Sequence, residues 1–371
     1  MVLFFCFKEL KKINAFRKLK SLRRPKMNTT EKKKLLIFVA VAYGMAYVMS
    51  ALMFIGFKKG YDLTAFVNTM MLYPACGVIL GKLICKKEDE KLPMFGYITV
   101  IVTCAIMVVM SICSLFIHFE PSKNGTDFWA SLSSVPLIIG SIVAYVAFWA
   151  CGKEKRINAG VQRSNFGWCI LWAFITVILL FGRVFLSVFA TDLFAHNHDG
   201  WNMLKGVFVS PSFWIGFIFL PFNFFLSWLA FFGEEYGWRY YLQPVMQRKM
   251  GKRLAVIVLG VVWALWHLGA DFMYYTTKDG PQAMVAQIIT CIAFAIFFGF
   301  LYMKTENIWL LAFAHFANNN LTALFAGGGS QAIQNQSIAW SQLPIQALSF
   351  IIFILFILAP IYSNKKKEKA E

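Results

Sequence analysis

The feature that most constrains this chain is a series of long stretches without Asp, Glu, Lys or Arg. About 20 apolar residues suffice for a helix that spans a bilayer. The uncharged stretches of the 371-residue chain cover residues 35–57, 63–81, 92–119, 128–152, 164–182, 206–233, 254–270, 280–303 and 307–364. The last is long enough for two helices, divided by the three glycines at 327–329. We therefore predict an all-α fold, a polytopic transmembrane helix bundle of about ten spans.

The composition agrees with a membrane protein and excludes other classes. Only 15% of the residues are charged and 59% are hydrophobic, whereas soluble chains carry about 25% charge. The 39 Phe and 12 Trp residues need a buried environment, which excludes a disordered chain. The eight cysteines form no C-x-x-C pair, so we interpret them as buried thiols, not as a disulfide framework or a zinc cluster.

The basic residues predict how the chain is oriented. Lys and Arg concentrate in the short cytoplasmic loops of membrane proteins. With ten spans, both termini share one side with the segments 82–91, 153–163 and 239–253 and with residue 304, and these regions hold 30 of the 36 basic residues. We therefore predict cytoplasmic termini and a lipid bilayer as partner. The net charge of +18 is then a topology signal, and nucleic acid is not expected as a partner.

The first polar cluster stands at the end of a long apolar stretch, where Glu234 and Glu235 are followed by Arg239. Ionisable groups inside spans are costly and usually functional. Glu235 and Arg239 are four residues apart, so on a helix they share a face and can form an ion pair. Glu234 points about 100° away and is available as a general base. The alternative is an interfacial belt of charges where a helix leaves the membrane.

Two further clusters lie on later spans. The first places Trp263 one turn before His267, and the second places His315 four residues before Asn319. A single buried histidine is commonly structural, but polar groups on three helices can converge. Together they can bind a metal, or position a water and an oxyanion. The spacing is not H-E-x-x-H, so a zincin motif on one helix does not apply.

The first cluster resembles the leading motif of the CPBP intramembrane proteases. This family includes the type II CAAX prenyl endopeptidases and bacterial relatives linked to bacteriocin maturation and self-immunity. Its motif E-E-x-x-x-R matches Glu234, Glu235 and Arg239. The resemblance extends over about residues 217–325.

The later clusters match the family's other two motifs in the expected order. The motif F-x-x-x-H is matched at His267, where Trp263 replaces the phenylalanine, an exchange of one aromatic ring for another that we expect to leave the role intact. The motif H-x-x-x-N/D is matched by His315 and Asn319. Three motifs in the right order on three separate spans make the resemblance fairly specific.

The resemblance implies the catalytic roles. Glu234 would be the general base, His267 would position the attacking water, and His315 with Asn319 would hold the oxyanion. We expect these groups at the floor of a cavity that is open to the cytoplasm.

Supporting residues and the question of a metal follow from the same resemblance. Glu235, Arg239 and Trp263 would support the catalytic groups or orient the substrate. Two histidines and a glutamate can ligate zinc, but the family is also described as glutamic peptidases, and we favour a metal-independent reaction. The substrate would be a peptide or a lipidated protein, and the location a bacterial cell membrane. The family core has about eight spans, so an eight-span core within this chain is compatible with the resemblance.

These interpretations divide the chain into four regions. Residues 1–34 form a basic cytoplasmic segment, which is either an amphipathic anchor on anionic lipid or the product of an upstream start before Met27. Residues 35–205 form an amino-terminal transmembrane region, 206–326 a CPBP-like catalytic core, and 327–371 a last transmembrane helix with a basic tail.

Two other classes of function remain open at this stage. One is a non-catalytic membrane protein of the same fold that confers immunity or acts as a scaffold. The other is a transporter, because transporters also carry polar groups within their spans. Arg183, at the inner edge of a span, either reaches the membrane surface, pairs with Glu235 or binds a substrate carboxylate.

Overall fold

The computed structural model describes residues 27–119, 127–327 and 333–363, and within these ranges it contains helices and no strand. The predicted all-α fold is confirmed. Hydrocarbon offers no partners to backbone N–H and C=O groups, and a helix pairs these groups internally. The two explanations of the basic amino terminus concern residues 1–26, which lie outside the described residues.

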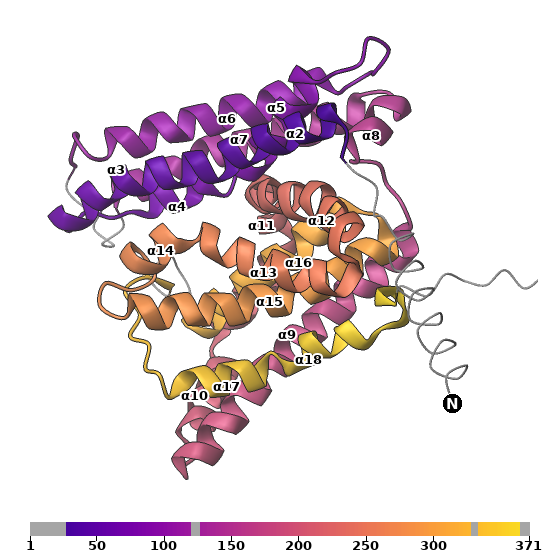
Figure 1. Cartoon of the computed structure of the whole chain (residues 1–371). Helices are drawn as coiled ribbons and strands as arrows, with labels where there is room; N and C mark the ends of the chain where they lie inside the picture. The colour runs from indigo at the N-terminus through magenta and orange to yellow at the C-terminus, as the bar shows by residue number, and fades with distance from the viewer. Residues whose placement is uncertain (1–26, 120–126, 328–332, 364–371) are drawn as a thin grey trace, which may run out of the picture.

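The helices of the amino-terminal region form one layer of the molecule, drawn in indigo and purple in Figure 1. A π-helix, η1 (Ala40–Gly44), joins the first two of them into one continuous helix, Thr29–Lys59. Residues 29–34 of the predicted cytoplasmic segment therefore already belong to this helix. The layer consists of α2 (Thr29–Val39), α3 (Met45–Lys59), α4 (Thr64–Met70), α5 (Tyr73–Ile84), α6 (Met94–Cys113) and α7 (Phe128–Ala150).

The remaining helices form the centre and the opposite layer of the molecule (Figure 1). The central helices are α11 (Pro211–Glu235), the π-helix η2 (Tyr236–Leu242), α12 (Gln243–Met250), α13 (Lys252–Trp266), α14 (Leu268–Met273), α15 (Gly280–Thr305) and α16 (Ile308–Phe325). The outer helices are α9 (Phe166–Ala195), α10 (Asp199–Val209), α17 (Gln342–Ser349), α18 (Ile351–Ile354) and the 3₁₀ turns η4 (Leu355–Leu358) and η5 (Pro360–Tyr362). The short α8 (Lys153–Ala159) connects α7 to α9.

Seven helices within the described residues are long and apolar enough to cross a membrane. They correspond to the first six predicted spans and to the one at 280–303, so the count of ten is not confirmed. The other three predicted spans are α13, α16 and the region 342–362, which is a series of short helices and not one continuous helix. With 15 residues, α13 is about 22 Å long, less than the roughly 30 Å of a hydrocarbon core.

Contacts between the connecting segments group them at two ends of the bundle. At one end, Lys91 pairs with Glu154 at 2.9 Å, and Arg248 pairs with Glu31 at 3.3 Å. The first pair joins the segments 82–91 and 153–163, and the second joins the amino-terminal segment to the segment 239–253. All four were predicted to be cytoplasmic. At the other end, residues 333–338 contact two further loops of that side, since Asp279 accepts a hydrogen bond from the N–H of Ile338 and Gln334 reaches residues 62 and 64.

Glycines allow the central helices to approach their neighbours closely next to the polar clusters. A Cβ atom on Gly233 would lie 2.3 Å from the carbonyl oxygen of Met71, and one on Gly260 would lie 2.5 Å from the Cα of Ile292. Small residues allow such backbone contact between membrane helices. These contacts fix α11 against the amino-terminal layer and α13 against α15.

Candidate active site

The first polar cluster lies in the middle of a long helix and not at its end. α11, η2 and α12 run without interruption from Pro211 to Met250, so the helix continues past Arg239 as the sequence required. Short π-helical segments are frequent at functional sites because their wider turns redirect side chains. Glu234 lies two residues before the start of η2 and is only 2% exposed.

Two tryptophans hold the carboxylate of Glu234. Its Oε2 accepts a hydrogen bond from the indole Nε1 of Trp263 at 2.7 Å and a longer one from that of Trp238 at 3.3 Å. No described residue donates a hydrogen bond to its Oε1. The carboxylate is therefore held through one oxygen, and its other oxygen is available to a water molecule.

Trp263 does more than the sequence comparison suggested. We expected its ring to take the place of the family's phenylalanine, but phenylalanine has no N–H group to donate to Glu234. The guanidinium of Arg239 also lies 4.2 Å from the Trp263 ring centroid, a cation–π contact. The identity of the residue as tryptophan was the signal in the sequence, and only the structure shows what its N–H group contacts.

The second carboxylate forms a buried network that joins two of the motifs. The Oε1 of Glu235 accepts hydrogen bonds from the Nη1 of Arg239 at 3.0 Å and from the Nδ1 of His315 at 2.9 Å. The ion pair predicted from the four-residue spacing is confirmed, and both of its side chains are fully buried. The bond to His315 was not predicted, because it joins residues 80 positions apart.

The hydrogen bonds of the two histidines define which ring nitrogen is free. The Nδ1 of His267 lies 3.0 Å from the carbonyl oxygen of Trp263, and the Nδ1 of His315 faces the Glu235 carboxylate. A carbonyl or a carboxylate can only accept, so each Nδ1 carries the proton. Each Nε2 is then a free acceptor in the neutral ring. His315 can donate from Nε2 to an oxyanion only when both of its ring nitrogens carry a proton.

Asn319 lies one turn beyond His315 and is exposed. Its Oδ1 accepts a hydrogen bond from the Nδ2 of Asn318 at 2.9 Å. With the oxygen occupied, the Nδ2 group of Asn319 is the part of the amide that remains available as a donor.

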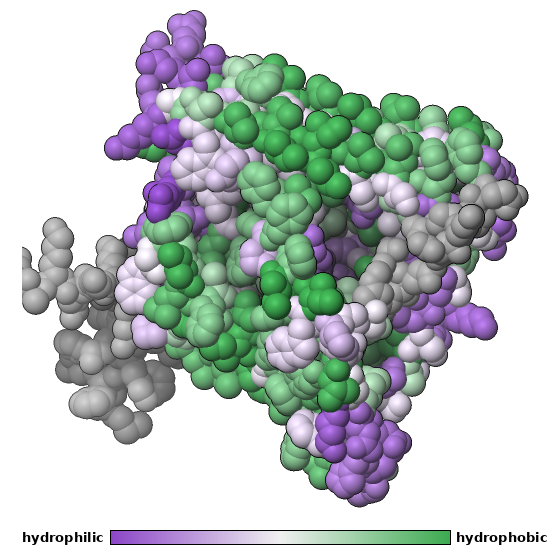
Figure 2. All heavy atoms as spheres, turned by 180° about the vertical axis from the view of Figure 1, so that it is seen from behind, coloured by the Kyte–Doolittle hydropathy of each residue, from purple (hydrophilic) through white to green (hydrophobic). Residues whose placement is uncertain are grey.

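These side chains share one cavity of about 1120 Å³, which is lined by Glu234, Trp263, His267, His315 and Asn319 among others. Glu235 and Arg239 lie behind its wall. In Figure 2 the molecule has a hollow between two apolar bodies, and hydrophilic residues are visible inside it. The structure thus brings the three motifs together on one accessible surface. A cavity with apolar walls and a few convergent polar groups is typical of a binding site.

The end of the bundle that carries the basic segments 82–91, 153–163 and 239–253 is called the basic end. The cavity extends away from it, which differs from our expectation of a cavity open to the cytoplasm. Its far part is lined by Tyr274 and Tyr275 and by residues of the segment 333–338, whereas no residue of the basic segments 82–91 or 153–163 lines it. The physical reason is the continuous helix: Tyr236 and Trp238 in η2 are fully buried and fill the space on the basic side of Glu234.

The central helices match the model of a known protein family. Residues 214–321 match the model of the type II CAAX prenyl endopeptidase Rce1-like proteins. The chain contains an Rce1-like region. A relative, the lysostaphin resistance protein A of Staphylococcus haemolyticus, is 26% identical over 164 residues. That match covers 43% of this chain and 40% of the relative, so the chain spans less than half the length of this curated protein. No solved structure matches the chain significantly.

The match confirms the resemblance drawn from the three motifs. The Rce1-like region contains all seven residues that the sequence analysis selected, from Glu234 to Asn319. Part of the cavity wall comes from outside the Rce1-like region. Its residues include Asn68 in the layer α2–α7, Arg183 in α9, and Gln346 in the segment after residue 321. The chain therefore completes the cavity of the Rce1-like region with residues beyond that region.

Arg183 neither extends to the membrane surface nor pairs with Glu235, the first two of the three alternatives named for it. Its Nη2 donates to the Oγ1 of Thr322 at 3.0 Å, and its guanidinium lies 5.0 Å from the ring centroid of Phe350. Arg183 lines the cavity. It forms no ion pair with Glu235, because the partners of the Glu235 carboxylate among the described residues are Arg239 and His315.

The residues of the site do not fit a bound metal ion. Within the described ranges, no group of three or more His, Cys, Asp and Glu side chains is arranged to hold one. Each histidine could offer only its Nε2, because its Nδ1 is hydrogen-bonded within the protein, and these atoms do not gather with the Glu234 carboxylate into a group that could hold a metal. We therefore derive no catalytic step through a zinc ion.

Proposed function

We propose that this integral membrane protein is an intramembrane endopeptidase that hydrolyses a peptide bond with a water molecule activated by Glu234. The observation that carries the proposal is the convergence of Glu234, His267, His315 and Asn319 on one cavity. The substrate class is a membrane-associated or lipidated polypeptide, and the location is a bacterial cell membrane. The match to the Rce1-like family and the bacterial relative support this assignment.

In the proposed reaction the attacking water lies between Glu234 and His267. The Oε1 of Glu234 takes a proton from the water, while the Nε2 of His267 accepts its second hydrogen and orients it. The water oxygen bonds to the carbonyl carbon of the substrate. The C–N bond then breaks, and the proton held by Glu234 passes to the leaving amine, which yields a carboxylic acid and an amine. The acid then releases the second proton of the water to solvent and becomes a carboxylate.

The negative charge of the tetrahedral intermediate requires donors on the other side of the carbonyl. The Nδ2 group of Asn319 supplies one such donor, and the Nε2–H of the His315 imidazolium supplies the other. Glu235 supports this role because a carboxylate on Nδ1 stabilises the imidazolium, as the aspartate does in serine proteases. Donors that are held in place before the reaction contribute most to such catalysis.

The test compares the peptide profiles of cells that express the wild-type protein or Glu234→Gln. We expect peptides that accumulate with the wild type to be missing from the variant. Glu31→Gln is the matched control, because it makes the same exchange at an exposed position. Identical profiles for the wild type and Glu234→Gln, at equal expression, would overturn the proposal.

The second candidate is a non-catalytic immunity or scaffold protein of the same fold. The name of the relative, lysostaphin resistance protein A, favours it. A scaffold would keep its biological effect in Glu234→Gln, whereas a protease would lose it. The two functions therefore predict opposite results for one variant.

A further inference from the structure

Asp271 is a buried acid that the proposed reaction does not use. It lies on α14, four residues after His267, and its side chain is 1% exposed. Its backbone N–H donates to the carbonyl oxygen of His267, so one helical turn carries both residues. Both side chains line the same cavity. Four residues of helix rise about 6 Å, which places Asp271 one turn from His267, further from the basic end of the bundle.

Neither carboxyl oxygen of Asp271 has a hydrogen-bond partner among the described residues. Asp192 differs, because it is also buried but accepts hydrogen bonds from the backbone N–H groups of Gly200 and Trp201. A buried polar group without a partner is unfavourable and needs an explanation. Its position on a cavity wall indicates that its partner is a ligand that enters the cavity.

The surroundings of Asp271 point to a cationic ligand. Arg183 is the one Lys or Arg among the described residues that line the cavity, and it is bonded to Thr322. The wall of the cavity also contains aromatic residues such as Trp266 and Phe294. A lysine or arginine side chain suits both features, because its hydrocarbon stem packs on apolar surface and its charge favours the ionised carboxylate.

We propose that Asp271 is a specificity-determining residue that binds a Lys or Arg side chain of the substrate, about two residues from the cleaved bond. The separation follows from the distance of one helical turn to His267, because an extended peptide advances about 3.3 Å per residue. The inference rests on the proposed function only for the cleavage step. Binding of the basic side chain does not require that function.

The first experiment measures binding without cleavage. The probes are fluorescent peptides of 20 mostly apolar residues, identical except for one lysine or one norleucine at a scanned position. They are titrated into nanodiscs that contain the Glu234→Gln protein, in which Asp271 is the only cavity acid left among the described residues. We expect the lysine peptide to bind about tenfold more tightly at its best position, in line with a hydrogen-bonded charge pair.

Variants then assign this preference to a residue. In Glu234→Gln/Asp271→Asn we expect the ratio of the two affinities to fall from about ten to about one. Asp271→Glu, which keeps the charge, restores part of the ratio. Asp199→Asn is the matched control, because Asp199 is exposed and lies outside the cavity wall, and it keeps the ratio of the parent. An unchanged preference in Asp271→Asn would overturn the proposal.

The second experiment uses protein with Glu234 intact and the same peptides as substrates. We expect Asp271→Asn to reduce the lysine preference through KM and not through kcat, because the residue binds the side chain and does not touch the reacting atoms. Binding preference without any cleavage would refute the proposed function and leave the role of Asp271 standing. Cleavage without a lysine preference would refute the role of Asp271 alone.

Discussion

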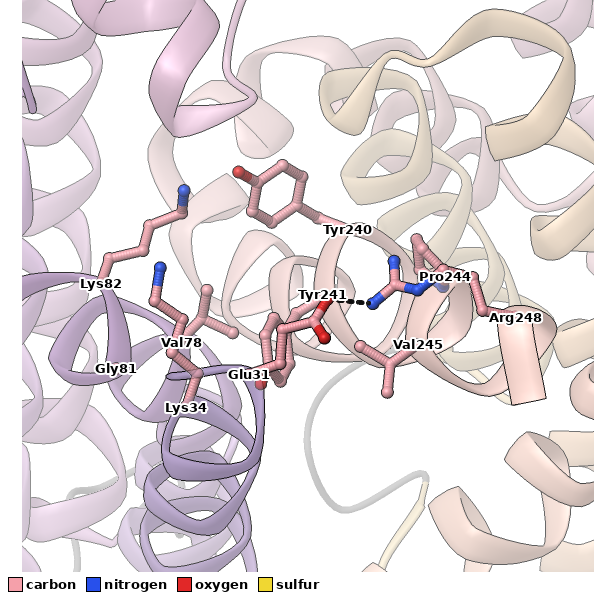
Figure 3. A pocket seen from close by; sticks show the side chains of 10 residues that line it. All are labelled: Glu31, Lys34, Val78, Gly81, Lys82, Tyr240, Tyr241, Pro244, Val245 and Arg248. Atoms are coloured by element: carbon pink, nitrogen blue, oxygen red, sulfur yellow. Dashed lines mark hydrogen bonds and ion pairs between the residues drawn. The ribbon is translucent and has the colours of Figure 1, made fainter. Parts of the chain in front are cut away.

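Two cavities beside the same long helix, one at its carboxy-terminal end and one at its middle, show two different uses of charge. The smaller, of about 270 Å³, lies at the basic end between α2, α5 and the segment η2–α12 (Figure 3). Lys34, Lys82 and Arg248 line it, and its one ion pair, Glu31–Arg248, has side chains that are 40% and 48% exposed. The larger cavity contains buried acids and histidines instead. Water stabilises the charges of the first, whereas protein groups must stabilise those of the second.

The difference teaches where this chain can tolerate change. An exposed ion pair contributes at most about 1 kcal/mol, because water competes for both partners. Breaking a buried ion pair is strongly destabilising, because the charge that remains is neither paired nor solvated. Substitutions around the smaller cavity and around the larger cavity should therefore have very different effects, and five experiments test this contrast.

The largest effect is expected from Glu234→Gln. The amide cannot take a proton from water, so we expect kcat/KM to fall by roughly 10³ or more. The measurement is hydrolysis of a quenched peptide in proteoliposomes, with Glu31→Gln as the control from the basic end. Equal losses in both variants would remove the contrast between the two cavities.

Glu235→Gln is expected to weaken the fold and not only the reaction. It leaves the fully buried Arg239 without its anionic partner, which costs about 3 to 5 kcal/mol. Thermal unfolding in detergent measures the loss. The same exchange at Glu31 should change stability by less than about 1 kcal/mol. A loss at residue 235 no larger than at residue 31 would contradict the buried network.

Trp263→Phe separates the ring from its N–H group. The phenylalanine keeps an aromatic ring next to Arg239 but gives up the hydrogen bond to Glu234. We expect a loss of about tenfold in kcat/KM, the equivalent of one hydrogen bond to a charged group. If Trp263→Phe is as active as the wild type, the ring alone carries the role of this residue.

Asp271→Leu is expected to stabilise the protein. It removes a carboxyl group without partners among the described residues, and the gain is about 1 kcal/mol. Asp192→Leu is the matched variant, because it removes a buried acid that accepts two hydrogen bonds, and it should destabilise. Both are measured by thermal unfolding. A loss of stability in both variants would indicate a structural role for Asp271.

The smallest effect is expected from Arg248→Ala at the basic end. Its side chain is half exposed and its pair with Glu31 is solvated, so stability should change by less than about 0.5 kcal/mol. Peptide hydrolysis in proteoliposomes should match that of the wild type. A large loss of activity would mean that the smaller cavity also serves the reaction.

The sequence predicted those contacts that lie within one helix. The Glu235–Arg239 pair follows from a spacing of four residues, and the continuation of the helix past Arg239 was required for the motifs to meet. Contacts between helices were not accessible in this way. The bond between Glu235 and His315 and the bond between Trp263 and Glu234 depend on how α11, α13 and α16 pack. Asp271 was overlooked because it directly follows an uncharged stretch and resembles a loop residue.

The sequence by itself determined that this chain is helical, that it belongs in a membrane and that its basic residues gather at one end. Those properties follow from the transfer of side chains between water and lipid, which depends on the residues alone. Only the tertiary structure decided that the polar motifs share one cavity and that this cavity extends away from the basic end. Hydropathy places a residue along the membrane normal, whereas the neighbours of a side chain and the space left between helices are set by packing.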